Sequence, residues 1–272
     1  MKANLIPSRQ TLRHFGETLL IGTVGGVVFN YAGMPAGFLS GAMIFVGIAA
    51  LAGRPMTIPS PVARVVYVAI GISLGGAVTP ETLKGISTWP LSVVILCVGM
   101  TCATFGSALY LRKVHGWDML SALFGSSPGA LSQVIAHATQ YHSDLRGIAF
   151  VQTVRVVILT AGLPLALSLF GLIPPGPAGR NLVVTESIPE LVALVIVSTV
   201  AAVTAHYVRF PGGLIFGAML ASAVLHGSGV IHAGMPWWVV AVVMIFLGSL
   251  SGSRFANTDL RMLAKYLLAA LG

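Results

Sequence analysis

The chain has 272 residues, of which 56% are hydrophobic and only 8% are charged, and its mean hydropathy is +0.92. A soluble domain carries about 25% charged residues, so this composition excludes an ordinary water-soluble protein and predicts one that lies largely in a lipid bilayer. The formal net charge of +8 comes from basic residues spread singly along short connections, which is typical of the positive-inside bias and not of nucleic-acid binding.

The pattern of apolar residues separates helices from a membrane β-barrel. Barrel strands alternate apolar and polar residues, whereas the apolar runs here are continuous, as in Leu191–Val197 and Trp237–Leu247. The 32 glycines also suit helices, because small residues let membrane helices approach closely. The sequence therefore predicts an all-α, polytopic membrane protein.

Eight apolar stretches are predicted to cross the membrane, since a crossing needs about 20 apolar residues, or fewer if it is short. In chain order they are Glu17–Ala32, Gly37–Gly53, Val62–Val78, Pro90–Leu111, Gly147–Leu172, Ile188–Val208, Gly213–Ile231 and Trp237–Ser253. A further segment, Met119–Tyr141, is broken by Ser126-Ser127-Pro128-Gly129, and Met262–Leu271 is too short to cross alone. We expect a helical bundle of about eight to nine spans, with residues 1–16 forming a basic N-terminal segment of a retained signal anchor.

The broken segment Met119–Tyr141 can either cross the membrane or dip in and return to the same side. If it re-enters and the N-terminus is cytoplasmic, only Lys84 and Arg180 lie outside. The cations then placed inside are Lys2, Arg9, Arg13, Arg54, Arg112, Lys113, Arg146, Arg209, Arg254, Arg261 and Lys265. If the segment crosses, the cations of this list from Arg146 onward are placed outside instead. Because cytoplasmic loops carry an excess of Lys and Arg, the re-entrant topology is favoured.

Two stretches of the chain resemble each other at a fixed offset. Met34–Met43 aligns with Phe210–Met219, so that one Pro, two Gly, one Ala and one Met coincide. After an offset one residue longer, Gly71, Gly75, Leu83 and Lys84 align with Gly248, Gly252, Leu260 and Arg261. An odd number of predicted crossings separates the copies, so they should run in opposite directions, as in the inverted repeats of many secondary transporters.

Each copy contains a predicted elbow between two helices. Pro35 and Pro211 are expected just inside a helix start, where a missing N–H costs nothing. The small-residue spacing that follows, Gly37 with Gly41 and Gly213 with Gly217, places two glycines on one helix face for close packing.

The second copy ends early in this alignment, because Gly272 aligns with Ile95. Either the chain is truncated relative to its relatives, or a second copy or another chain supplies the rest of the repeat.

The broken segment is the first candidate for a substrate site. Unwound backbone at membrane depth is tolerated only where protein or a watery cavity lines it, and a helix restarting after the break would present N–H groups to an anion. A packing kink is the alternative. The substrate-binding candidates are Ser126, Ser127, Pro128, Gly129, Ser132 and Gln133.

The second candidate is Gln152 with Arg155, which are three residues apart and share a helix face. A charged residue within a span is a functional candidate by default, although Arg155 could also snorkel to the interface or form a structural pair. His137 is a candidate proton relay, with an interfacial polar cap formed with His142, Asp144 and Arg146 as the alternative.

The remaining histidines and the cysteines show no metal-binding spacing, and we predict neither a metal nor another cofactor. His14, His115, His206, His226 and His232 lie near predicted span ends, where their polar tips should face water. Cys97 and Cys102 are expected to be buried small residues within one span.

These motifs together resemble the AbrB family of bacterial membrane proteins, which are built from a duplicated unit. The resemblance covers nearly the whole chain, and its most specific part runs from Ser126–Ser132 through Asp144-Leu145-Arg146 to Val151–Arg155. It implies a first AbrB-like membrane repeat over residues 17–172, a loop over 173–187 and a second, incomplete repeat over 188–272. It also implies a bacterial inner-membrane location and the family's two labels, ammonia monooxygenase and regulator of gene expression.

The leading functional prediction is a secondary-transporter-like permease for a small solute, with anions as the favoured class. The alternative is a membrane sensor that affects gene expression indirectly, and an ammonia monooxygenase is a distant third, because an oxygenase needs a clustered metal site. We therefore expect no enzyme activity, and we expect the lipid bilayer and a small solute as partners, without nucleic acid.

Overall fold

The structure is a computed structural model that describes residues 9–86, 89–127, 134, 138, 144–171 and 187–256. The chain divides into two compact units. Unit 1 comprises Met1–Leu83 and Thr160–Asn257, and unit 2 comprises Lys84–Leu159 and Thr258–Gly272.

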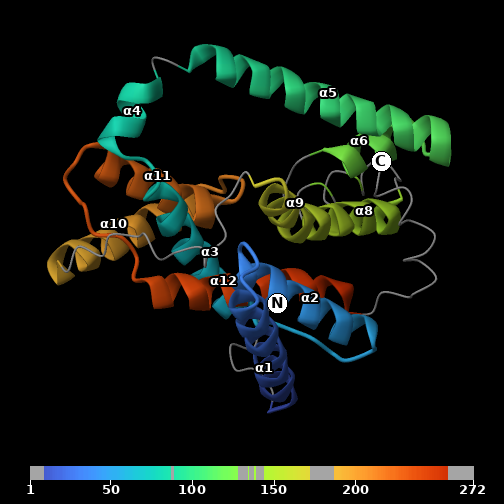
Figure 1. Cartoon of the computed structure of the whole chain (residues 1–272), viewed down its shortest axis with the longest axis horizontal. Helices are drawn as coiled ribbons and strands as arrows, with labels where there is room; N and C mark the ends of the chain where they lie inside the picture. Colours follow the sequence, from blue (N-terminus) through green and yellow to red (C-terminus); the bar gives the residue numbers. More distant parts are fainter. Residues whose placement is uncertain are drawn as a thin grey trace. The chain divides into compact units, whose positions relative to one another are not determined.

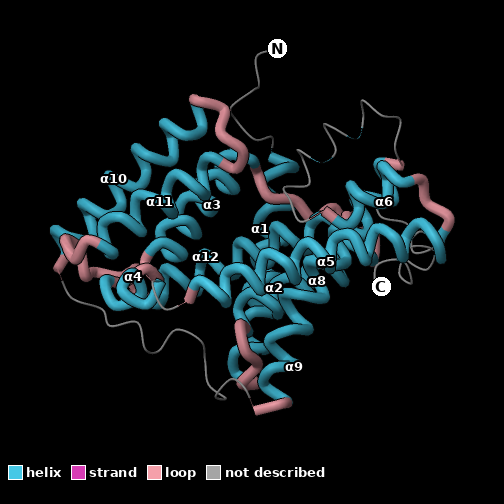
Figure 2. The backbone as a smooth tube through the Cα atoms, turned by 90° about the horizontal axis from the view of Figure 1, so that it is seen from above, coloured by secondary structure: helices cyan, strands magenta, loops and turns pink. Residues whose placement is uncertain are grey.

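Every regular element among the described residues is helical, which confirms the all-α prediction (Figures 1 and 2). Unit 1 contains α1 (Arg9–Tyr31), α2 (Gly37–Leu51), α3 (Ser60–Gly75), α9 (Leu163–Leu169), α10 (Ile188–Tyr207), α11 (Gly213–Gly227) and α12 (Trp237–Gly252), with a 3₁₀ turn at Ser253–Phe255. Unit 2 contains α5 (Pro90–His115), α6 (Met119–Ser126) and α8 (Leu145–Val157). The short helix α4 (Pro80–Ile86) lies at one boundary between the units, and a π-helical turn, Ile158–Gly162, lies at a second.

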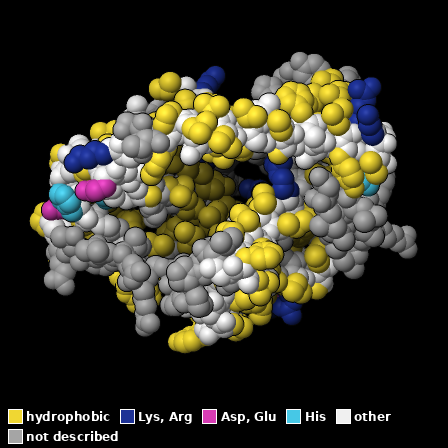
Figure 3. Space-filling model, turned by 45° about the horizontal axis from the view of Figure 1, so that its top comes forward, with side chains coloured by type: hydrophobic (Ala, Val, Ile, Leu, Met, Phe, Trp, Pro, Cys, Tyr) yellow, Lys and Arg dark blue, Asp and Glu magenta, His cyan; other side chains and the backbone are white. Residues whose placement is uncertain are grey.

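Three described helical segments are long and apolar enough to cross a membrane: Pro90–His115, Ile188–Tyr207 and Trp237–Phe255. Four shorter apolar helices lie at Gly37–Leu51, Ser60–Gly75, Gly147–Thr160 and Gly213–Gly227. Hydrophobic side chains also cover much of the face seen in Figure 3. These features agree with a membrane protein, while the count of eight to nine spans stays a prediction.

Unit 1 contains two tight helical hairpins, α1–α2 and α10–α11. The residue before the second helix of each hairpin is left-handed, Ala36 at φ 52° and Gly212 at φ 64°. The helices therefore begin at Gly37 and Gly213, and the prediction that Pro35 and Pro211 lie just inside a helix start is wrong. A left-handed residue cannot continue an α-helix, so each proline belongs to the turn.

Glycine brings the two helices of each hairpin into backbone contact. A Cβ built on Gly37 would lie 2.6 Å from Asn30 Cα, and one on Gly213 would lie 2.7 Å from the carbonyl carbon of Ala205. One turn further along the second helix, Gly41 faces the carbonyl of Gly25 in the same way. Gly217 likewise faces the carbonyl of Ala201. All four positions exclude a larger residue, as predicted for the elbow glycines.

The helix that follows each hairpin packs on the other hairpin: α3 follows α1–α2 and packs on α11, and α12 follows α10–α11 and packs on α2. Helix α3 lies along α11, where a Cβ on Gly71 would be 2.5 Å from the carbonyl oxygen of Ile215, and Gly75 faces the carbonyl of Met219. Helix α12 lies along α2 in the same manner. There Gly248 faces the carbonyl of Leu39, and a Cβ on Gly252 would be 2.5 Å from the carbonyl oxygen of Met43. Leu39 and Met43 are the residues that align with Ile215 and Met219 in the sequence.

Helices α3 and α12 meet in one apolar cluster. Its buried members are Val66, Ile70 and Val243, and Val62, Ala69, Val239, Phe246 and Leu247 pack against them. When Gly71 is aligned with Gly248, each α3 member of this cluster has its aligned α12 residue in the same cluster.

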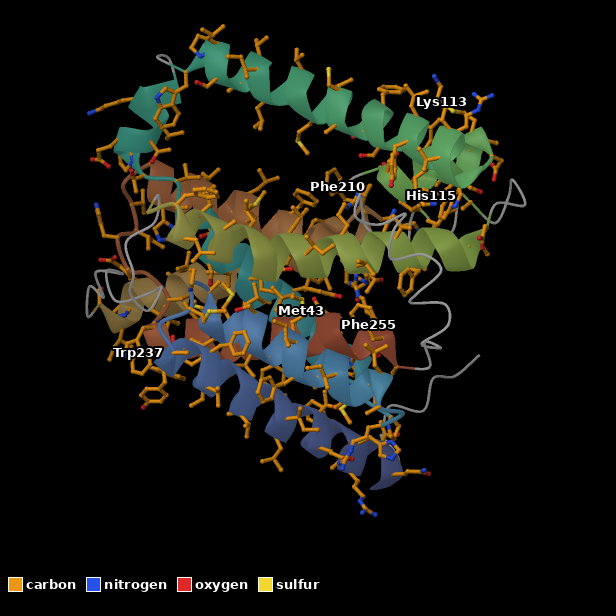
Figure 4. The ribbon with its side chains drawn as sticks, turned by 45° about the vertical axis from the view of Figure 1, so that its right-hand side comes forward. Met43, Lys113, His115, Phe210, Trp237 and Phe255 are labelled. Atoms are coloured by element: carbon orange, nitrogen blue, oxygen red, sulfur yellow. The ribbon has the colours of Figure 1, made fainter. Side chains whose placement is uncertain are left out.

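One end of unit 1 carries the positive charge. The start of α1 and the ends of α2 and α12 lie together there, because α2 runs antiparallel to α1 and parallel to α12. Helix α3 starts at the same end, since the N–H of Thr57 donates to Thr18 Oγ1 at 3.0 Å. In Figure 4, Phe255 and Trp237 mark opposite ends of α12. Arg13 and Arg54 lie close to Glu17 at this Phe255 end of unit 1, where Arg254 also lies, and we call it the basic end.

Much of the surface of α5 in unit 2 is exposed. Leu91, Ile95 and Leu96 are each more than 60% exposed, and no atom lies within 4 Å of a Cβ built on Gly99 or Gly106. Cys97 and Cys102 are free and exposed. The expectation that these cysteines are buried is therefore wrong, because the buried residues that the structure describes in this span, Ala108 and Leu111, lie nearer its end.

Replacing a contact glycine by alanine should destabilise unit 1. We expect Gly71→Ala and Gly248→Ala each to lose about 1–3 kcal/mol, the cost of overpacking a tight interface, because the new methyl group would meet backbone atoms. Thermal unfolding of the purified protein in detergent measures the loss. The matched control is Gly99→Ala, which adds a methyl group in open space and should leave stability unchanged or slightly raised. Equal losses in all three variants would contradict this packing.

Candidate functional site

The candidate site lies in unit 2, where α6 and α8 run side by side in the same direction. At their beginnings, the N–H of Asp144 donates to Ser121 Oγ at 3.0 Å. At their ends, Gln152 and Arg155 of α8 reach the last residues of α6. The chain that leaves α6 at Ser127 has therefore returned to the level of the start of α6 when it reaches Asp144.

Both helices begin with an aspartate cap. Asp118 Oδ2 accepts a hydrogen bond from the N–H of Ser121 at 2.9 Å, and Asp144 Oδ1 accepts one from the N–H of Gly147 at 3.1 Å. Trp117 lies against Gly147, where a Cβ would be 2.8 Å from the indole ring. An N-cap aspartate satisfies N–H groups that have no partner within the helix, so these residues fix the start of each helix.

Hydrogen bonding shifts the acidity of the first cap. Partial burial raises the pKa of Asp118, but the hydrogen bonds that its carboxylate accepts, chiefly from Ser121, outweigh this effect. The pKa of Asp118 therefore lies below its ordinary value. The charged form of this cap is the stabilising one.

Helix α6 ends at Ser126, within the break that the sequence predicts. Ser127 is extended, with φ −61° and ψ 129°, as expected for a residue that precedes a proline. The last carbonyl groups of a helix have no partner within it, and they form the negative end of the helix dipole. The end of α6 therefore needs donors from elsewhere in the protein.

Two side chains of α8 supply these donors. Gln152 Nε2 donates to the carbonyl oxygen of Phe124 at 2.8 Å. Arg155 Nη1 donates to the carbonyl oxygen of Ser126 at 2.8 Å, and Nη2 donates to that of Ser127 at 3.1 Å. Gln152 is 3% exposed, whereas Arg155 is only partly buried. The guanidinium thus places a positive charge directly on the negative end of α6.

The structure brings together four of the predicted site residues, Ser126, Ser127, Gln152 and Arg155. The hydroxyl of Ser126 is itself engaged, since it donates to the carbonyl oxygen of Leu123 at 3.2 Å. The other candidates fall outside the described residues: Pro128, Gly129, Ser132, Gln133 and His137.

An apolar cluster lies beside these polar groups. Its buried members are Val134, Ala138 and Ile148, with Trp117, Phe124 and Leu145 packed against them. This cluster shields the α6–α8 contact from water on one side, which strengthens the hydrogen bonds made there.

The elbow residues belong to unit 1 and lie outside this cluster of site residues. Pro35, Gly37 and Gly41 form one elbow, and Pro211, Gly213 and Gly217 form the other. Their role is to pack the two hairpins.

His226 is a residue whose surroundings the sequence did not predict. It was expected to face water, but it is 8% exposed. Its Nδ1 lies 2.8 Å from the carbonyl oxygen of Ser222, and its Nε2 lies 3.2 Å from that of Ala233. Ser222 Oγ in turn donates to the carbonyl oxygen of Ile72 at 2.8 Å. Ser222 and His226 are four residues apart on one helix, and this spacing was the sequence signal that the two side chains lie together.

Metal ligands do not gather among the residues that the structure describes. No group of three or more His, Cys, Asp or Glu side chains lies close enough in those ranges to hold a metal ion. Ion pairing in the same ranges joins Glu17 of α1 to Arg54. Glu17 therefore forms an ion pair at the basic end. It lies within α1, which begins at Arg9, although the predicted span began at Glu17.

Comparison with known proteins gives a consistent family. The family model described as "Transition state regulatory protein AbrB" matches residues 38–272. A protein of Escherichia coli (strain K12) named "Putative regulator AbrB" is 24% identical over 243 residues, which is 89% of this chain and 70% of the relative. "Uncharacterized protein YhjN" of Bacillus subtilis (strain 168) is 22% identical over 259 residues, covering 87% of this chain and 67% of the relative. No solved structure matches.

Removing the first aspartate cap should weaken unit 2. We expect Asp118→Ala to cost about 0.5–1 kcal/mol, at the low end for N-caps because the carboxylate is mostly exposed and solvent screens it. A lowered pKa means that this stabilisation is complete above the unfolded value, about 3.9, and is lost as the pH falls towards the folded value. Asp118→Asn keeps an acceptor without a charge, so it should cost less. Thermal unfolding measured from pH 3 to pH 7 should show a weaker acid dependence in both variants than in the wild type, and an unchanged dependence would contradict this role.

Proposed function

The chain belongs to the AbrB family, and from its geometry we propose that it is a secondary-transporter-like permease for a small solute. The observation that carries this proposal is the exchanged packing in unit 1. The glycine contacts of α3 on α11 are matched, residue for aligned residue, by those of α12 on α2.

This correspondence supports an internal inverted repeat. The α1–α2 elbow lies away from the basic end and the α10–α11 elbow lies at it, so the two hairpins point in opposite directions. Helices α3 and α12 cross at Val66 and Val243, which are aligned residues within one cluster. An approximate two-fold axis through this crossing would exchange helices α1–α3 with helices α10–α12. Inverted repeats of this kind let a transporter open alternately to either side of the membrane.

The charge distribution supports a membrane orientation. The positive-inside rule assigns the end with excess Arg to the cytoplasm, and in unit 1 that is the basic end. The start of α1 lies there, so we infer a cytoplasmic N-terminus and an inner-membrane location. Exposed Trp237 and Trp238 lie at the opposite end, where an interfacial aromatic belt would place them.

The arrangement of α6 and α8 supports re-entry of Met119–Tyr141. Trp117, just after the end of α5, packs on Gly147 near the start of α8. Arg112 and Lys113 lie in the last turn of α5, and Figure 4 labels Lys113 and His115 at that end of the helix. Because α6 and α8 start at the same level, the proposed topology places Arg112, Lys113 and Arg146 on the cytoplasmic side.

The favoured solute class follows from Arg155. Its guanidinium lies at a helix break within an apolar unit, where a fixed positive charge lowers the cost of bringing in an anion. Gln152 adds a buried amide beside it. We therefore propose a small anion as the transported solute, with Arg155 as the residue that supplies the attraction. A catalytic role forms no part of this proposal.

The relatives' names favour a second candidate, a membrane sensor that changes gene expression indirectly. Under this alternative the same broken helix would bind a solute without moving it across the membrane. The two candidates differ in one measurable property, which is net flux.

Single-cysteine labelling tests the topology. In a background with Cys97→Ala and Cys102→Ala, we expect Ala52→Cys, Val114→Cys and Asp144→Cys to react only after the cytoplasmic face is opened. Ser228→Cys, at the opposite end of unit 1, should react from the periplasm in intact cells. Periplasmic labelling of Asp144→Cys would rule out re-entry, and labelling of Ala52→Cys and Ser228→Cys from the same side would rule out the proposed orientation of unit 1.

Solute flux tests the permease. Purified protein in liposomes should take up at least one of radiolabelled acetate, succinate or inorganic phosphate faster than empty liposomes, while glycerol and methylammonium show no protein-dependent uptake. We expect Arg155→Met to reduce this uptake at least tenfold, because an unpaired helix end and a lost charge each cost about 1–3 kcal/mol.

The control variant is Arg112→Ala, an exposed cation at the end of α5, which should retain uptake. If no probe in the panel moves but a deletion strain shows altered gene expression, the sensor replaces the permease as the better explanation. Equal uptake by Arg155→Met and the wild type would remove Arg155 from the transport site.

A further inference from the structure

The C-terminal end of α6 is a site built to hold a cation. The carbonyl oxygens of Ser126 and Ser127 both accept from the Arg155 guanidinium, and that of Phe124 accepts from Gln152, so all three face the region beside α8. They also form the negative end of the helix dipole. Carbonyl oxygens at the end of a broken membrane helix are the ligands that secondary transporters use for a coupling cation such as Na⁺.

In this protein a side chain fills that region. The two terminal nitrogens of Arg155 bond the carbonyl oxygens of two successive residues, Ser126 and Ser127, at 2.8 and 3.1 Å. A planar guanidinium suits this arrangement, because its donors lie in a fixed fork whereas an ammonium is a point charge. Gln152 bonds the third carbonyl oxygen, so each of the three oxygens has a donor without any metal ion.

We propose that the Arg155 guanidinium is a built-in replacement for an alkali coupling cation at the end of α6. The wild-type protein then binds no Na⁺ or K⁺ there, and removal of the side chain leaves a carbonyl site that accepts a free cation. The positive charge stays attached to α8 throughout any cycle. If the permease proposal holds, its solute therefore moves without an alkali cation at this site.

Chemical rescue tests this proposal through stability and not through flux. The purified full chain and its variants would be unfolded thermally in three buffers of equal ionic strength, with millimolar guanidinium chloride, sodium chloride or N-methylglucamine chloride. The variants are Arg155→Ala and the control Arg112→Ala. The third salt supplies a cation too large to sit between the carbonyl groups.

We expect Arg155→Ala to melt about 5 °C below the wild type, as one or two unsatisfied helix carbonyls would produce. Guanidinium should recover about half of that loss, and Na⁺ a smaller part, relative to N-methylglucamine. The wild type and Arg112→Ala should show no such difference between the salts. If guanidinium and Na⁺ stabilise Arg155→Ala no more than they stabilise the wild type, the proposal is overturned.

A second pair of variants keeps the test decisive if Arg155→Ala does not fold. Arg155→Lys keeps the charge, and Arg155→Met keeps the length without it. We expect the lysine variant to melt higher than the methionine variant and to be insensitive to Na⁺, whereas equal stability of the two would overturn the proposal. A protein that shows rescue but no flux would refute the permease and leave the built-in cation standing, so the two failures are distinguishable.

Discussion

Backbone groups inside a bilayer have no water to bond, so they must be covered by other backbone or by a donor from a side chain. The helices of unit 1 bond their own backbone groups, and glycine then lets these helices pack closely. Where α3 lies on α11 and α12 lies on α2, glycines at 71, 75, 248 and 252 let one helix touch the carbonyl groups of the next. Such close approach gives membrane helices the van der Waals contact that holds them together, because lipid tails are as apolar as the helices and drive no association by themselves.

Unit 2 meets the same constraint with charge. Helix α6 stops at Ser126, and its open end would be costly without a donor. Gln152 and Arg155 lie one helical turn apart on α8 and reach this end together. The arginine is therefore part of the architecture of the break, and any solute that it attracts meets a guanidinium already oriented by two carbonyl oxygens.

Sequence reasoning located most helices because their apolar runs and end signals are local. It predicted the starts of the hairpin helices at Gly37 and Gly213 and the end of α6 near Ser126. It misplaced Pro35 and Pro211: Pro211-Gly212 is itself a turn signal, whereas a left-handed alanine such as Ala36 has no signature in the sequence. It could not find the carbonyl partners of Arg155, since backbone atoms of another helix leave no trace in composition. His226 was misjudged for a similar reason: Ala233, on the connection after α11, covers its ring.

The packing of α3 on α11 and of α12 on α2 has a consequence for biosynthesis, because it joins helices that are far apart in the sequence. Among the described residues, the glycines of α3 meet carbonyl groups of α11, and α2 meets the glycines of α12, which is made much later than α2. The hydrogen bond from Ser222 to the carbonyl oxygen of Ile72 likewise joins segments made far apart in time. The α1–α2 hairpin can close early through its own glycines, whereas the packing of α2 and α3 is completed only after α11 and α12 have been synthesised.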